Sequence, residues 1–319
     1  MSDVRQSGPA ALFQVVTLAV LTAALLFRLQ DRAPATHWTY WVLVAGFWVC
    51  AWEFNHTLSA SKGPLSRVAG WMAPWIFGAT LLILWEALCV GLGVPTVLLP
   101  APSLIAAKMA ASLPILWADF FQTVLRAAIP GWTMGCAAGF LVALTCDRFD
   151  FLRRGLMPIG NFISALPIIG IAPILVMWFG FDWQSKAAVV VVMTFFPMLV
   201  NTVAGLASAG QLERDLMRSY GASWFSTLVS LRLPAAMPFI FNALKINATL
   251  AMIGAIVAEF FGTPVVGMGF RISTEVGRMA LDMVWATIAV AGLAGSAFYG
   301  ILVLVERSVT FWHPSTRAG

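Results

Sequence analysis

Long apolar segments, separated by short polar ones, occupy most of the chain. A helix needs about 20 apolar residues to cross a bilayer. Eight segments come near that length: 11–27, 38–54, 71–91, 120–144, 156–178, 186–205, 238–258 and 284–305. The pattern predicts an all-α, polytopic membrane protein. A polar stretch after the second segment predicts an N-terminal pair of transmembrane helices with its linker, 1–66, and a six-helix core, 67–319.

The first segment has some features of a signal peptide. Arg5 precedes it, and Ala33-Pro34-Ala35 loosely matches a cleavage site. However, Arg28 and Arg32 stand just before that site, and another apolar segment follows at once. We therefore expect the first segment to be retained as a membrane helix.

Two later segments carry residues that expose or disturb a helix backbone. Segment 120–144 has a glycine every four residues, which lets another helix approach closely; these are Gly131, Gly135 and Gly139. Segment 156–178 contains three prolines and two glycines: Pro158, Gly160, Pro167, Gly170 and Pro173. A broken helix survives in a membrane only where protein or water satisfies its freed backbone groups. We expect this segment to be broken and to face the interior, near a transport path.

Composition supports the membrane class and limits the partners. Of 319 residues, 60% are hydrophobic and 10% are charged, whereas soluble proteins carry about 25% charged residues. The mean hydropathy is +0.87 and the net charge is +5. In a membrane protein this excess belongs to cytoplasmic loops, so we expect contact with lipid and none with nucleic acid. The distribution of Lys and Arg favours an orientation with both termini cytoplasmic, and we expect the membrane to be a plasma (bacterial inner) membrane.

The chain carries few candidates for catalytic or metal chemistry. Its four cysteines form no Cys-x-x-Cys pair, and its three histidines are scattered. Neither His-Glu-x-x-His nor Gly-x-Ser-x-Gly occurs, so we expect no catalytic residue and no metal. None of the four lysines follows a glycine, so the chain has no phosphate-binding loop of the Gly-Lys-Ser/Thr type. Any ATP that drives this protein must be bound by another chain.

A long hydrophilic interruption, 208–234, separates two apolar segments in the second half. Its first part, 211–220, has a helical pattern, and Gly221 is a stop signal for that helix. A second short helix can begin at Ser223, and Pro234 begins the return to the membrane. A cytoplasmic helix-turn-helix of this kind is either a docking element for a soluble partner or a plain surface loop.

The spacing within this loop resembles that of a known family. Gly221, nine residues and then Leu231-Arg232-Leu233-Pro234 are similar to the Gly-x9-hydrophobic-x-Leu-Pro core of the "EAA" coupling loop. That loop marks the permeases of type I ATP-binding-cassette (ABC) importers. The family's Glu-Ala-Ala corresponds to Asp215-Leu216-Met217, which keeps only the acidic character. The resemblance implies an ATPase-coupling set: Glu213, Asp215, Gly221, Ala222, Ser223, Leu231, Leu233 and Pro234.

Other segments extend the resemblance over about residues 70–310. Residues 165–180, 196–206 and 258–259 look like the nitrate, sulfonate, taurine and thiamine-precursor branch, while the N-terminal pair lies outside it. The family implies a non-catalytic transmembrane subunit with no cofactor of its own. Its implied partners are ABC ATPase subunits that bind ATP, an external solute-binding protein, and a second permease subunit, identical or different.

Polar residues inside apolar segments are candidates for the substrate path, because burying them in lipid is costly. We expect the path to include Asn161, Ser164, Pro167, Thr194, Asn201 and Glu259. Glu259 has two open interpretations: an ion pair with Arg271 or Arg278, or a substrate gate. We expect Lys245 to extend toward the cytoplasmic interface.

The substrate is the least constrained property. Members that resemble the sulfonate branch carry Gly-Arg where this chain has Thr249-Leu250. The missing cation favours a small neutral or aromatic solute, such as a pyrimidine-type thiamine precursor. A sulfonate, taurine or nitrate importer is the alternative. A secondary transporter or channel would place ionisable residues at mid-membrane, and a membrane enzyme would need a catalytic cluster; the sequence offers little for either.

Overall fold

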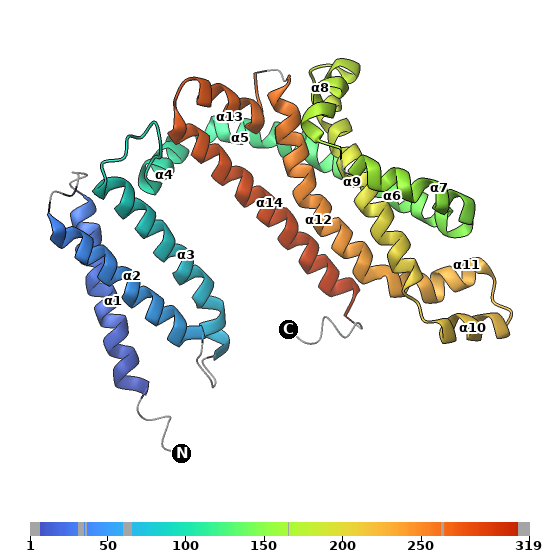
Figure 1. The fold of residues 1–319 in the computed structure, drawn as a ribbon, viewed down its shortest axis with the longest axis horizontal. Coiled ribbons are helices and arrows are strands. Elements are labelled where there is room, and N and C mark those ends of the chain that lie inside the picture. Colours follow the sequence, from blue (N-terminus) through green and yellow to red (C-terminus); the bar gives the residue numbers. More distant parts are fainter. Residues whose placement is uncertain are drawn as a thin grey trace. The chain divides into compact units, whose positions relative to one another are not determined.

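The structure is a computed structural model that describes residues 7–30, 35, 37–59, 66–164, 166–262 and 265–311. Within these ranges the chain is helical and contains no strand (Figure 1). The N-terminal helices are α1 (Ser7–Leu29), α2 (Trp38–Ser59), α3 (Ser66–Gly91) and α4 (Pro102–Ala111). The remaining ones are α5 (Leu113–Phe120), the π-helix η1 (Phe121–Ala128), α6 (Ile129–Arg148), α7 (Asp150–Ser164), α8 (Ile168–Phe179), α9 (Trp183–Ala207), α10 (Gln211–Ser219), α11 (Trp224–Thr227), the π-helix η2 (Leu228–Arg232), α12 (Leu233–Phe260), α13 (Met268–Gly277) and α14 (Leu281–Val309).

Among the residues that the structure describes, five stretches of helix are long and apolar enough to cross a membrane. They are Gly70–Gly91, Leu113–Arg148, Trp183–Ala207, Trp224–Phe260 and Leu281–Val309. Part of α1, Gln14–Leu29, and α8 are shorter apolar helices. The second predicted segment forms α2, a 22-residue helix that is not among the five. The prediction of an all-α polytopic membrane protein is confirmed.

The proline-rich segment is broken, as predicted. α7 ends at Ser164 and α8 begins at Ile168, and Pro167 is the N-cap residue of α8. Pro158 and Pro173 instead lie inside α7 and α8. α8 has only 12 residues, about 18 Å at about 1.5 Å per residue, so α8 alone does not cross a bilayer.

The chain forms two compact units. Residues 1–111 and 279–286 form the first, and the rest of the chain forms the second. In the first unit, Leu25, Phe47 and Ala87 are part of a core shared by α1, α2 and α3, and the Tyr40 hydroxyl donates to the Ala87 carbonyl at 2.7 Å. The expected functional division at residue 66 stays a prediction.

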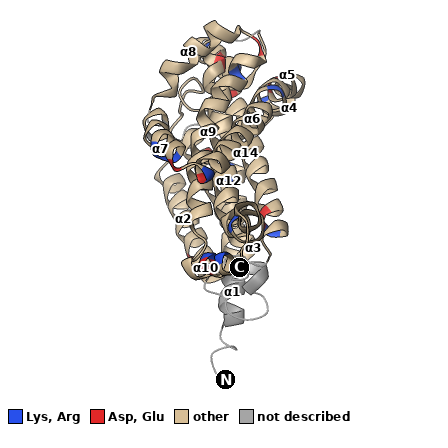
Figure 2. Cartoon of the chain, turned by 90° about the vertical axis from the view of Figure 1, so that its right-hand side faces the viewer, with Lys and Arg blue, Asp and Glu red and all other residues tan. Residues whose placement is uncertain are grey.

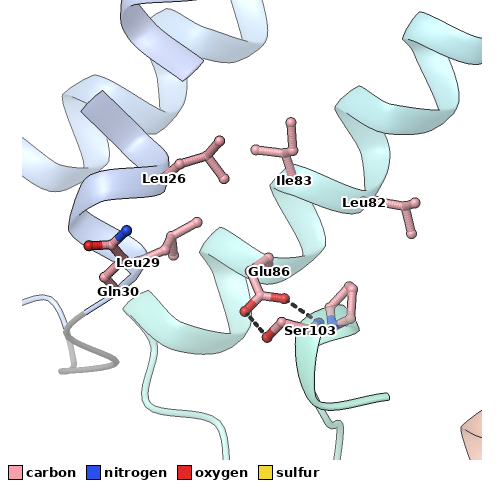
Figure 3. Close-up of a pocket in the computed structure, with 8 residues that line it drawn as sticks. Leu26, Leu29, Gln30, Leu82, Ile83, Glu86 and Ser103 are labelled. Atoms are coloured by element: carbon pink, nitrogen blue, oxygen red, sulfur yellow. Dashed lines mark hydrogen bonds between the residues drawn. The ribbon is translucent and has the colours of Figure 1, made fainter. Parts of the chain in front are cut away.

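Glu86 holds the start of α4 in this first unit. Its carboxylate accepts from the Ser103 backbone N–H at 2.8 Å and from the Ser103 hydroxyl at 2.6 Å. Figure 3 shows these bonds at the edge of a pocket with leucine and isoleucine side chains from α1 and α3. The carboxylate therefore pairs a backbone donor at the N-terminus of α4, where helices lack internal acceptors.

In the second unit α9 lies at the centre and packs closely against α6 and α12. A Cβ added to Gly131 would lie 2.6 Å from the Val190 Cβ and 2.8 Å from the Ala187 carbonyl oxygen. A Cβ on Gly205 would lie 2.8 Å from the Phe239 Cβ on α12. The glycines of α6 thus permit a close helix contact, as their spacing predicts.

Candidate functional site

The loop between α9 and α12 is an ordered helix-turn-helix. α10 covers the residues expected to be helical and ends in a Schellman motif: the Gly221 N–H donates to the Arg218 carbonyl at 2.9 Å, and the Ala222 N–H donates to the Met217 carbonyl at 3.0 Å. Gly221 has φ +68°, a left-handed conformation that favours glycine. Figure 1 shows α10 and α11 together beyond the ends of α9 and α12.

The second half of the loop begins with a helix cap and continues into the next span. The Ser223 hydroxyl accepts from the Ser226 N–H at 3.2 Å, an N-cap bond that starts α11. The helix then passes through η2 into α12, with Pro234 in its first turn. Of the eight predicted coupling residues, four are exposed (Glu213, Asp215, Gly221 and Ser223) and four are half-buried (Ala222, Leu231, Leu233 and Pro234).

Large apolar side chains on this loop face solvent, a feature that the sequence reasoning missed. Leu212, Leu216 and Tyr220 are 82%, 55% and 82% exposed. Their i, i+4 spacing places Leu212 and Leu216 on one face of α10, and Tyr220 continues this row at the C-cap of the helix. Phe225 on α11 is also exposed. The spacing alone would have identified this apolar stripe.

Charged side chains join the loop to the spans. Arg232 forms a bidentate ion pair with Asp147 at the end of α6, and its Nε donates to the Leu206 carbonyl of α9 at 3.1 Å. Arg214 donates to the Ala207 carbonyl at 2.7 Å. Figure 2 shows charged residues near α10, whereas most of the chain is uncharged. The sequence reasoning did not predict these contacts of the two arginines.

The predicted path residues are held by different parts of the second unit. Pro167 lies at the break before α8. Thr194 is buried where α9 meets α6, and its hydroxyl donates to the Val190 carbonyl at 2.9 Å. The Asn201 amide donates to the Pro197 carbonyl at 2.8 Å within α9. The side chains of Asn161 and Ser164 lie outside those that the structure describes. Their roles in a path stay predictions.

Glu259 sits in a buried polar centre at the end of α12. Its carboxylate accepts from the Thr123 hydroxyl at 2.8 Å and from the Gly269 N–H at 2.7 Å. The same hydroxyl accepts from the Met268 N–H at 2.8 Å. Thr123 and Glu259 therefore connect η1 and α12 to the beginning of α13.

The ion pairs expected for Glu259 were wrong. Arg271 pairs with Asp119 of α5, its Nε donating at 2.8 Å, and Arg278 pairs with Glu275 at 3.3 Å. Asp119, hydrogen-bonded to the Arg271 guanidinium, raises the pKa of Arg271 above its ordinary value. The pairing of Arg271 could not be predicted because Asp119 lies 152 residues earlier in the sequence. No local pattern connects the two residues.

Lys245 has a partner that the sequence reasoning missed. Its ammonium forms an ion pair with Glu306 in the last turn of α14 at 2.7 Å, and both side chains are largely buried. Because an unpaired cation inside a span is costly, this carboxylate stabilises the charge, and the extension of Lys245 toward the cytoplasmic interface stays a prediction.

Known proteins resemble this chain over most of its length. Residues 135–311 match the family described as "Binding-protein-dependent transport system inner membrane component". A riboflavin transport system permease protein of Chloroflexus aurantiacus is 30% identical over 74% of this chain and 88% of its own. A formylaminopyrimidine transport permease protein of Halalkalibacterium halodurans is 29% identical over 76% and 96%. A putative aliphatic sulfonates transport permease protein of Bacillus subtilis is 26% identical over 80% and 92%.

The family match covers α9, the helix-turn-helix loop and α12, which are the elements whose geometry is described above. It thus agrees with the loop spacing and with the long apolar helices. The chain belongs to the family of inner membrane components of binding-protein-dependent transport systems, the permeases of type I ABC importers.

Proposed function

We propose that the loop 208–234 docks onto a separate ABC ATPase and couples ATP hydrolysis to transport through this permease. The observation that carries the proposal is the stripe of Leu212, Leu216 and Tyr220, three exposed apolar side chains on a helix that is firmly joined to the spans. Exposed apolar patches of soluble segments mark interaction surfaces. The partners are an ATPase, which supplies the ATP-binding machinery, an external solute-binding protein and a second permease subunit.

Docking on an ATPase fixes an orientation for the membrane. The loop is then cytoplasmic, and so are both termini, in agreement with the distribution of Lys and Arg. The opposite ends of α9 and α12, with Glu259, Asp119 and Arg271, then face the outside, where a solute-binding protein delivers its cargo. The membrane is the bacterial inner membrane.

A second permease subunit provides cover for the broken segment. Freed backbone groups at membrane depth need protein or water around them. Met177 and Trp178 on α8 are 84% and 74% exposed in the single chain. We propose that this face meets the second subunit and the substrate path between the two.

For the substrate we propose a small neutral or aromatic solute, such as a thiamine-precursor pyrimidine. Leu250, not a cation, occupies the position at which a sulfonate-type permease carries arginine, and the nearby Lys245 is neutralised by Glu306. The relatives named for riboflavin and formylaminopyrimidine support this class. The relative named for aliphatic sulfonates supports the alternative, an anionic substrate.

Co-purification with candidate ATPase subunits tests the docking surface. Tyr220→Glu should abolish capture of the ATPase that the wild-type chain binds. Phe151→Glu is the matched control, because Phe151 is an equally exposed aromatic residue, at 85%, on α7. If both variants still capture the ATPase, the stripe of Leu212, Leu216 and Tyr220 is not part of the interface. If the wild type binds no ATPase under conditions where a related importer pair assembles, the importer role itself fails.

The substrate class is tested on the assembled complex in proteoliposomes. ATPase stimulation by binding protein loaded with formylaminopyrimidine, and none with taurine or an alkanesulfonate, is the expected result. Stimulation by the sulfonate alone would replace the proposed class with the anionic one.

A further inference from the structure

Asp147 and Arg232 form a largely buried ion pair between two elements that are distant in sequence. Arg232 Nη1 donates to Asp147 Oδ2 at 2.6 Å, and Nη2 donates to Oδ1. The side chains of Asp147 and Arg232 are 8% and 15% exposed. A bidentate pair of this type fixes the relative orientation of its two planes as well as their separation.

The same guanidinium also holds the end of α9. Its Nε donates to the Leu206 carbonyl at 3.1 Å, and Arg214 donates to that carbonyl at 3.2 Å. The last carbonyls of a helix lack partners within the helix and attract cations. The three guanidinium nitrogens of Arg232 therefore join the loop to α6 and α9.

The link between the loop and α6 differs from the others because the loop is not continuous with α6 along the chain. The loop continues directly from α9 and directly into α12, whereas Asp147 on α6 lies 85 residues before Arg232. The other contact of this kind is between the Arg148 guanidinium and the Trp224 ring, 5.3 Å from its centroid. The end of α6 thus receives two side-chain contacts from the loop.

We infer that Asp147 is a positioning residue for coupling: through Arg232 it ties α6 to the loop, so that a displacement of the loop moves α6 together with α9 and α12. This inference rests on the proposed docking of the loop on an ATPase. Asp147 itself touches neither the ATPase nor the solute. Its role is to ensure that α6, α9 and α12 all move when the loop moves.

Three variants separate the pair from its individual charges. Asp147→Asn keeps the shape and removes the charge. Arg232→Lys keeps the positive charge but loses the planar guanidinium, and a single ammonium cannot reproduce the bidentate geometry. The double variant Asp147→Arg with Arg232→Asp restores an ion pair with the two charges exchanged. Asp150→Asn is the control, since Asp150 pairs only on the surface, with Arg154 at 3.2 Å.

The measurement is the amount of solute transported per ATP hydrolysed by the complete complex, with its binding protein, in proteoliposomes. Asp147→Asn and Arg232→Lys should still capture the ATPase, but the ratio should fall about tenfold, as expected for the loss of charge-assisted hydrogen bonds. The double variant should recover part of the ratio, and Asp150→Asn should match the wild type.

Two outcomes would overturn the inference. A wild-type ratio in Asp147→Asn would mean that α6 follows the loop without the pair. Loss of ATPase capture in both Asp147→Asn and Arg232→Lys would mean that the pair only folds the loop. Failure of the wild-type chain to bind an ATPase is a different result, because it refutes the docking proposal and is seen before any variant is made.

Discussion

Replacing Gly131 with alanine tests the close contact between α6 and α9. The new Cβ would lie 2.6 Å from the Val190 Cβ and 2.8 Å from the Ala187 carbonyl oxygen. Both are well inside ordinary van der Waals contact, which for carbon atoms is about 3.5–4.0 Å. The contacting atoms are the Cβ of the fully buried Val190 and a backbone oxygen, and rotation about a side-chain bond moves neither of them. The helices must separate.

The magnitude follows from two opposing contributions. Overpacking of a close contact costs about 1–3 kcal/mol, and alanine gains about 1 kcal/mol over glycine in helix propensity. The free energy of unfolding should therefore fall by between about 0 and about 2 kcal/mol, which places Gly131→Ala about 1–3 kcal/mol below an alanine introduced without overpacking. Gly300→Ala in α14 is the matched control, because no atom lies within 4 Å of its added Cβ; it should stabilise by up to about 1 kcal/mol.

Reversible unfolding in mixed micelles with increasing SDS, followed by tryptophan fluorescence, measures both free energies. The reasoning is refuted if Gly131→Ala gains as much stability as Gly300→Ala does. That result would mean that α6 and α9 do not approach as closely at Gly131 as the structure has them.

Three further predictions concern the loop and the polar centre. Gly221→Ala meets no atom within 4 Å, so only the left-handed backbone opposes it, at about 1 kcal/mol; ATPase binding in a titration should weaken about fivefold, and Gly221→Asn should weaken it less. Thr123→Val removes the hydroxyl that bridges Glu259 to α13 and should cost about 1–3 kcal/mol of unfolding free energy, whereas Thr123→Ser should cost less. Because Asp119 raises the pKa of Arg271, the stabilisation that depends on the Arg271 charge is complete below the ordinary guanidinium pKa and is lost only as pH rises through the raised value. Thermal stability should therefore not decline through this charge near neutral pH, whereas Arg271→His should lose stability as pH rises above about 6.5, the ordinary histidine pKa.

Local signals in the sequence identified the loop and the broken span correctly. Gly221 ends a helix because its backbone is left-handed, and Pro167 begins one because a proline nitrogen has no hydrogen to donate. The glycines of α6 are visible as a spacing because one helix face recurs about every four residues. Each of these signals is contained within a few residues of the feature that it predicts.

Long-range charge pairs could not be predicted in the same way. Asp147 and Arg232 lie 85 residues apart, and nothing in the sequence near either residue identifies the other as its partner. The partner of Lys245, Glu306, lies 61 residues later on another helix. Charges inside a membrane protein must find partners, but which partner they find depends on helix packing that sequence spacing does not encode.

The continuous helix Leu113–Arg148 carries Asp119 near one end and Asp147 near the other. About 40 Å of helix axis separates the two carboxylates at about 1.5 Å per residue, and each is tied to a different arginine. The π-helix η1 lies toward the Asp119 end of this helix and Pro130 lies near its middle, and such sites are where helices bend. If the loop docks on an ATPase as proposed, an axial push at the Asp147 end is transmitted along one continuous helix and becomes a tilt of the Asp119 end.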